Sequence, residues 1–220
     1  MTGLRIPGFP GRIESVDLGT LWIFGAWSVY VITAYRPIMT IGTPWGGILH
    51  EVLRSAIFLA PVLFMLPRGV AMGWGGASQR GALGMVFGVS IVWALVAACA
   101  AVGLQAKAWN TQGLTPSFWL TTFSTAVVVE EIAFRGMLLR GWLELGRPWA
   151  VTVTAALFVA IHWPGWWWLE RMATPLDWLS TSASIFVLGL LLGSLYRRYR
   201  SIWPGVLLHA VNNFVAQVFI

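Results

Sequence analysis

Long apolar segments bounded by proline, glycine and charged residues dominate this sequence. The chain is 58% hydrophobic and only 10% charged, whereas soluble domains carry about 25% charged residues. Apolar segments of this length predict helices that cross a lipid bilayer. The predicted spans are residues 18–34, 48–66, 82–104, 117–143, 149–168, 182–196 and 202–219. We therefore predict an all-α fold, a polytopic transmembrane helical bundle that forms a single membrane domain over residues 1–220, with seven spanning helices, or eight if one segment is split.

The placement of basic residues predicts the orientation of this bundle. With the N-terminus in the cytoplasm, the inner side carries Arg5, Arg12, Arg68, Arg80, Arg140, Arg147, Arg197, Arg198 and Arg200, and the outer side carries Arg36, Lys107 and Arg171. This bias agrees with the positive-inside rule and places Ile220 outside. We expect the cytoplasmic membrane of a bacterium or archaeon. The net charge of +6 then suits anionic lipid headgroups rather than a nucleic acid.

Two adjacent glutamates interrupt one of the apolar segments. They are Glu130 and Glu131 in the run STAVVVEEIAFRGMLL. A charged carboxylate inside a bilayer costs at least about 2.5–3.5 kcal/mol, so such residues usually belong to a functional site. On a helix, Glu131 and Arg135 share a face, while Glu130 points about 100° away. We expect Arg135 to neutralise Glu131 and Glu130 to face a cavity.

Two further pairs place polar side chains on later apolar segments. Phe158 and His162 are four residues apart in ALFVAIHWPG, so the phenyl ring can pack beside the imidazole. His209 and Asn213 have the same spacing in PGVLLHAVNNF and share one helix face. Each histidine alone would more often be structural than functional. Together with the glutamates, they predict one polar site assembled from three helices.

The chemistry of these side chains favours hydrolysis. A carboxylate with an imidazole can take a proton from water, and His or Asn N–H groups can stabilise the oxyanion that forms. Cys99, the only cysteine, has no histidine near it in the sequence and allows no intramolecular disulfide. Two alternatives stay open: a transport or binding protein that uses the cluster as a proton or ligand site, and a zinc protease with Glu and His ligands.

The three motifs together resemble one known family. EExxxR (Glu130, Glu131, Arg135), FxxxH (Phe158, His162) and HxxxN (His209, Asn213) are similar to those of the CPBP family, also called Abi, which includes CAAX prenyl proteases and bacteriocin-processing proteins. The resemblance covers about residues 115–220. It implies a glutamic intramembrane endopeptidase, and we expect its substrate to be a membrane-associated protein or peptide. Because the amide of Asn213 is a poor zinc ligand but a good oxyanion donor, we predict no bound metal and no other cofactor.

The resemblance also implies a role for each motif residue. Glu130 matches the glutamate that activates water, and His162 the histidine that assists it. His209 and Asn213 match the pair that stabilises the oxyanion. The supporting residues are Glu131, Arg135 and Phe158.

Polar residues also occur in the first half of the chain. His50, Glu51 and Arg54 begin the segment GGILHEVLRSA, where Glu51 and Arg54 can form an ion pair. This group predicts either a capped helix start at the interface or a gate for substrate. In the second half, Gly189 and Gly193 form a GxxxG motif, which predicts close helix packing inside the bundle.

Overall fold

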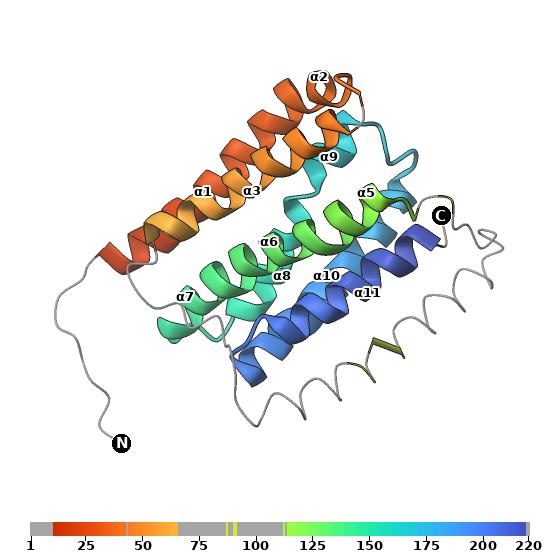
Figure 1. Ribbon diagram of the computed structural model, residues 1–220. Coiled ribbons are helices and arrows are strands. Elements are labelled where there is room, and N and C mark those ends of the chain that lie inside the picture. Colours follow the sequence, from red (N-terminus) through yellow and green to blue (C-terminus); the bar gives the residue numbers. More distant parts are fainter. Residues whose placement is uncertain are drawn as a thin grey trace.

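The computed structural model describes residues 11–42, 44–65 and 114–218, together with 87, 90, 91 and 112. The regular elements in these ranges are all helices, as the sequence predicted (Figure 1). Apart from residues 87, 90 and 91, the predicted span 82–104 lies outside the described residues. Cys99 and Lys107 also lie outside them.

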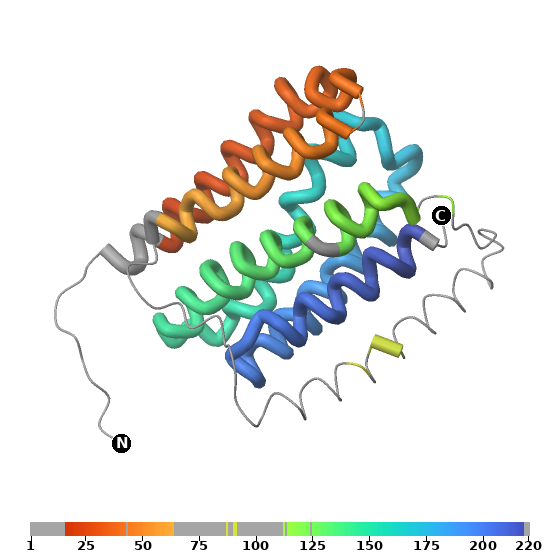
Figure 2. Tube along the Cα trace, viewed as in Figure 1, coloured from red at the N-terminus to blue at the C-terminus, as the bar shows by residue number. Residues whose placement is uncertain are grey.

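The N-terminal part of the chain forms a helical hairpin. Its first arm is a continuous rod made of α1 (Gly11–Tyr30), the π-helical segment η1 (Val31–Tyr35) and α2 (Arg36–Met39). The second arm, α3 (Trp45–Met65), runs back beside α1, as the traces in Figures 1 and 2 show. The hairpin packs through α3 against the middle of the molecule.

A second continuous rod occupies that middle position and carries the two glutamates. It consists of α5 (Pro116–Phe118), η2 (Trp119–Thr125), α6 (Ala126–Glu131), η3 (Ile132–Leu139) and α7 (Arg140–Glu144). The two π-helical segments flank α6, so Glu131 is the last residue before the wider turns of η3 begin. Widened turns of this kind occur frequently at functional sites.

A tight turn at Gly146 leads from this rod into the next helix. Gly146 adopts a left-handed conformation (φ 71°), which glycine tolerates without strain. The N–H of Gly146 donates to Leu143 (3.0 Å) and that of Arg147 to Trp142 (3.1 Å), which is the hydrogen-bond pattern of a Schellman cap. The chain can therefore reverse and run back along η3.

The remaining helices pack beside the rod and against one another. They are α8 (Ala150–Ala160), α9 (Trp163–Trp168), α10 (Pro175–Tyr199) and α11 (Trp203–Val218). A capping box between Thr174 and Asp177 starts α10, and Pro175 occupies its first turn. In the shared core of these helices, buried apolar side chains come from the rod, α8, α10 and α11; they include Phe134, Leu138, Phe158, Leu188, Leu192 and Leu208.

Helix α10 lies directly against α8, and its two glycines explain the close approach. A Cβ added at Gly189 would lie 3.0 Å from Ala155, and one at Gly193 would lie 2.9 Å from Val151. Larger side chains at either position would force the two helices apart. The packing role predicted for the GxxxG motif inside the bundle is confirmed.

Four helical stretches in the described residues are long and apolar enough to cross a membrane. They are Val16–Met39, Trp45–Leu63, Ala150–Trp168 and Pro175–Tyr199, which correspond to the predicted spans 18–34, 48–66, 149–168 and 182–196. The stretch 117–143 is helical but carries the charged motif at its centre, and α11 has only 16 residues. The count of seven spans remains a prediction.

Candidate active site

Glu131 lies at the centre of the polar site. Its side chain is fully buried (0% exposed) at the end of α6. Its Oε1 atom accepts hydrogen bonds from Nη1 of Arg135 (3.0 Å) and from Nδ1 of His209 (3.1 Å). One carboxylate oxygen therefore joins the middle rod to α11.

Arg135 is the buried cation that balances this carboxylate. It is 1% exposed, and its guanidinium carbon lies 4.4 Å from the centre of the Phe158 ring. Its Nη2 atom points toward the carbonyl oxygen of Gly189, 3.5 Å away on α10. A buried ion pair with a cation–π contact is stable only while both partners are present, because either charge alone would be strongly destabilised. The expected pairing of Arg135 with Glu131 is present.

Glu130 lies outside this ion pair. Its side chain is 15% exposed, and its Oε2 atom lies 3.8 Å from Nε2 of His209. The imidazole of His209 therefore lies between the two glutamates, with one nitrogen toward each. As the spacing on the helix predicted, the two carboxylates have different surroundings.

His162 follows α8 and is the N-cap residue of α9. Its Nδ1 atom lies 2.7 Å from the carbonyl oxygen of Phe158. A carbonyl oxygen only accepts hydrogen bonds, so Nδ1 carries the proton, and Nε2 of the neutral ring keeps its lone pair. His162 and Glu130 interact electrostatically, but no hydrogen bond or ion pair within 4.0 Å joins them in the described part of the chain.

Phe158 fixes the orientation of both histidines. The centre of its ring lies 5.2 Å from that of His162 and 5.4 Å from that of His209, with the planes nearly perpendicular in both cases. The predicted packing of Phe158 beside His162 is therefore observed. Its contact with His209 extends this role to a second helix.

Asn213 lies one helical turn beyond His209 on α11 and is held by a different partner. Its Nδ2 atom donates to the carbonyl oxygen of Thr122 in η2 at 3.1 Å. An amide nitrogen carries two N–H groups, so one donor remains after this bond. The structure thus groups six of the predicted site residues closely and places Asn213 at the edge of the group; the six are Glu130, Glu131, Arg135, Phe158, His162 and His209.

Gly205 is a site residue that the sequence analysis did not identify. A Cβ added at this position would lie 2.7 Å from Oε2 of Glu131, inside van der Waals contact. That oxygen is buried and has no hydrogen-bond partner among the described residues. In the sequence, Pro204 and Gly205 look like residues that commonly begin a helix. The requirement for glycine becomes visible only from the close approach of α11 to α6.

The polar group on α3 lies on the hairpin side of the site. Glu51 forms an ion pair with Arg54, which is 9% exposed, and Nδ1 of His50 lies 2.6 Å from the hydroxyl of Tyr30. Glu51 also interacts electrostatically with Glu130, and α3 packs against α6. The ion pair predicted for the helix start is present, within a larger cluster that faces the middle rod.

Metal coordination requires several ligands around one point. In residues 11–42, 44–65 and 114–218, the His, Cys, Asp and Glu side chains form no group of three that could hold a metal ion. This arrangement does not favour the zinc alternative.

The structure combines apolar helices that can cross a membrane with a buried group of carboxylates and imidazoles. These features define a polytopic membrane protein with a candidate hydrolytic site. The family model described as Type II CAAX prenyl endopeptidase Rce1-like matches residues 112–215, just under half of the chain, and this region contains all three motifs. The match supports the family predicted from the motifs: residues 112–215 are similar to the CAAX prenyl endopeptidases, which are membrane proteases. Neither a curated protein nor a solved structure matches the chain.

Proposed function

We propose that this protein hydrolyses a peptide bond of a membrane-associated protein or peptide, using water activated by Glu130. The observation that carries the proposal is the division of labour between the two glutamates. Arg135 binds Glu131 at 3.0 Å, whereas Glu130 is partly exposed and lies outside that ion pair. A general base needs a carboxylate that can reach a water molecule and accept its proton.

The surroundings of Glu130 suit this reaction. Nε2 of His162 can accept a hydrogen bond from the same water, because Nδ1 of that ring is held by Phe158. Glu130 takes one proton as the water oxygen bonds to the carbonyl carbon of the substrate. The proton then passes to the leaving amine as the C–N bond breaks, which leaves a carboxylic acid and an amine as products.

The oxyanion would be stabilised from α11. The second N–H of Asn213 is free of the bond to Thr122. Nε2 of His209 lies 3.8 Å from Glu130 and can also donate when the ring carries a proton on each nitrogen, because Nδ1 already donates to Glu131. Glu131 and Arg135 support the site by holding His209 through its Nδ1 atom. A transporter that uses the same residues would not need Glu130 and His162 to share one water molecule beside the oxyanion donors.

The bundle that holds this site is proposed to have seven spans, with the N-terminus in the cytoplasm and the C-terminus outside. The substrate would then be cleaved within or beside the bilayer. The family name points to a prenylated C-terminal tail, so this class of peptide is the first to test.

The decisive experiment compares Glu130→Gln with the unmodified protein in proteoliposomes, using a fluorescence-quenched peptide in prenylated and unprenylated forms. We expect kcat to fall by about two to four orders of magnitude, because the base is lost with little change in volume. The matched control is Glu144→Gln, a glutamate that pairs with Arg140 on the surface and is 43% exposed. Near-normal turnover by Glu130→Gln would rule out the glutamic mechanism.

A further inference from the structure

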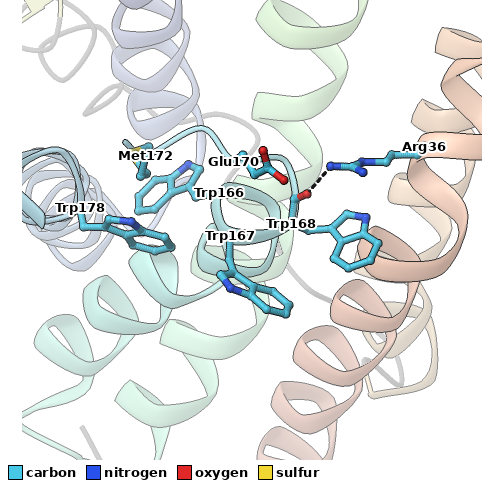
Figure 3. Close-up of a pocket in the computed structure, with 7 residues that line it drawn as sticks. All are labelled: Arg36, Trp166, Trp167, Trp168, Glu170, Met172 and Trp178. Atoms are coloured by element: carbon cyan, nitrogen blue, oxygen red, sulfur yellow. Dashed lines mark hydrogen bonds between the residues drawn. The ribbon is translucent and has the colours of Figure 1, made fainter. Parts of the chain in front are cut away.

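A cavity of about 420 Å³ lies at one end of the bundle, outside the residues of the proposed active site. It is lined by Arg36, Trp166, Trp167, Trp168, Glu170, Met172 and Trp178 (Figure 3). Three of the potential spanning helices meet there: Val16–Met39 and Ala150–Trp168 near their last residues and Pro175–Tyr199 near its first. In a membrane, the cavity would lie at the level of the lipid headgroups.

Four tryptophans form the walls of this cavity. The rings of Trp166 and Trp178 meet edge to face with their centres 5.8 Å apart, and those of Trp167 and Trp168 are 6.1 Å apart. Trp167 is 64% exposed, although it is large and apolar. Tryptophan is enriched at membrane interfaces, and its ring face attracts cations, including quaternary ammonium groups.

Two opposite charges also line the cavity. Arg36 lies over the ring of Trp168 (5.3 Å) and donates to the Trp168 carbonyl oxygen at 2.7 Å. This bond uses one of five guanidinium donors, so the others remain for an anion. Glu170 is exposed just beyond α9, in a left-handed conformation (φ 54°). No ion pair within 4.0 Å joins Arg36 and Glu170 in the described part of the chain, so neither charge cancels the other by direct contact.

We propose that this cavity binds the headgroup of a zwitterionic phospholipid, such as phosphatidylethanolamine or phosphatidylcholine. Arg36 binds the phosphate, which matches the planar donor fork of a guanidinium. The ammonium group lies against the tryptophan faces and Glu170. A purely anionic headgroup would meet the carboxylate of Glu170, and a purely cationic ligand would meet Arg36.

The surroundings of the cavity also suit a lipid. Leu176 and Leu179 are 70% and 67% exposed in the first turns of α10, on either side of Trp178 in the sequence. They provide an apolar surface along which acyl chains can run toward the membrane interior. The headgroup is thus held by polar contacts at the interface, and the chains stay in hydrocarbon.

The test is lipid retention by the full-length protein in detergent, measured by native mass spectrometry. Dioleoyl phosphatidylethanolamine, phosphatidylcholine, phosphatidylglycerol and dioleoylglycerol are added separately at equal concentration. We expect the protein to retain phosphatidylethanolamine and phosphatidylcholine and to retain little phosphatidylglycerol or dioleoylglycerol. In Arg36→Gln and in Glu170→Gln, the affinity for the two retained lipids should be about tenfold weaker, because one charge-assisted contact is lost. The matched control is Arg171→Gln, which removes a neighbouring exposed cation that does not line the cavity.

Arg36→Lys provides a second variant that keeps the charge and loses the donor fork. Intermediate retention by this variant supports phosphate binding. Equal retention of phosphatidylglycerol and phosphatidylethanolamine by the unmodified protein would overturn the proposal, as would unchanged retention in both Arg36→Gln and Glu170→Gln. Arg36-dependent binding of a peptide with a free C-terminal carboxylate, lost on amidation and competing with lipid, would assign the cavity to a peptide terminus instead.

Discussion

The Nδ1 atom of His209 lies 3.1 Å from Oε1 of Glu131, although 78 residues separate the two in the sequence. The same oxygen accepts a hydrogen bond from Arg135 at 3.0 Å. Glu131 therefore connects the first and third sequence motifs, and we assign it a mainly structural role. The first prediction follows from this connection.

Glu131→Gln should destabilise the protein strongly, because the Arg135 charge would remain buried without a carboxylate. The cost expected for breaking such a pair is about 3–5 kcal/mol. Thermal unfolding in detergent measures it, with Glu144→Gln as a surface control that should change stability by at most about 1 kcal/mol. The double variant Glu131→Met, Arg135→Met should recover much of the lost stability. A Glu131→Gln protein that melts like the unmodified one would contradict this account.

Gly205→Ala should perturb the site from the side of α11. The new methyl carbon would lie 2.7 Å from Oε2 of Glu131, so either the carboxylate or the helix must move. We expect a loss of about 1–3 kcal/mol of stability together with reduced activity. The control is Gly25→Ala in α1, where nothing lies within 4 Å of the added carbon. Equal melting temperatures and equal activities for the two variants would count against the close approach of α11.

His162→Asn should separate the two functions of the imidazole. The asparagine amide can still donate to the carbonyl oxygen of Phe158, but nothing replaces Nε2. We expect a nearly unchanged melting temperature and a kcat lower by about two to four orders of magnitude. His162→Ala, which loses both atoms, should show the same loss of kcat with lower stability. Full activity of His162→Asn would remove this histidine from the proposed mechanism.

Removal of divalent metals should leave proteolysis unchanged. The mechanism proposed here uses Glu130, His162, His209 and Asn213 with water as the nucleophile, and an amide is a poor zinc ligand. Activity is measured after dialysis against a strong chelator and again after zinc is added back. Stoichiometric zinc in the purified protein, with activity that depends on its return, would establish the zinc alternative.

Reporter fusions test the predicted orientation. A reporter placed after Ile220 should be found outside, and one inserted at residues 197–200 should be found in the cytoplasm. The two fusions give opposite signals if the segment 202–219 crosses the membrane, and an outside signal after Ile220 fits an odd number of spans after a cytoplasmic N-terminus. A cytoplasmic signal from the fusion after Ile220 would change the span count by one.

Helical periodicity accounts for the parts of the site that the sequence predicted. Glu131 with Arg135 and Phe158 with His162 are four residues apart, and residues at that spacing meet on any regular helix. The same geometry placed Glu130 on a different face from Glu131. Contacts within one helix can therefore be predicted from spacing alone.

Contacts between helices could not be predicted in this way. The sequence analysis expected His209 to act on the substrate and did not predict its hydrogen bond to Glu131. This bond depends on how α11 crosses α6. The bond from Asn213 to Thr122 and the close approach at Gly205 depend on the same crossing. The π-helical turns beside Glu131 also have no marker in residue type, since Ile, Ala, Phe and Leu fit an ordinary helix equally well.

Phe158 has no titratable atom, yet it restricts the motion of both imidazoles. Its ring meets His162 at 85° and His209 at 87°, with the guanidinium of Arg135 against it at 4.4 Å. In an open cavity these side chains would occupy several rotamers. Here the entropy cost of ordering them is met once, when the bundle folds, and does not recur in each turnover. Preorganisation of this site then depends on an apolar ring. A smaller side chain at position 158 would keep all the reacting groups but allow the two imidazoles more rotamers, and the reaction would slow because each turnover would have to order them.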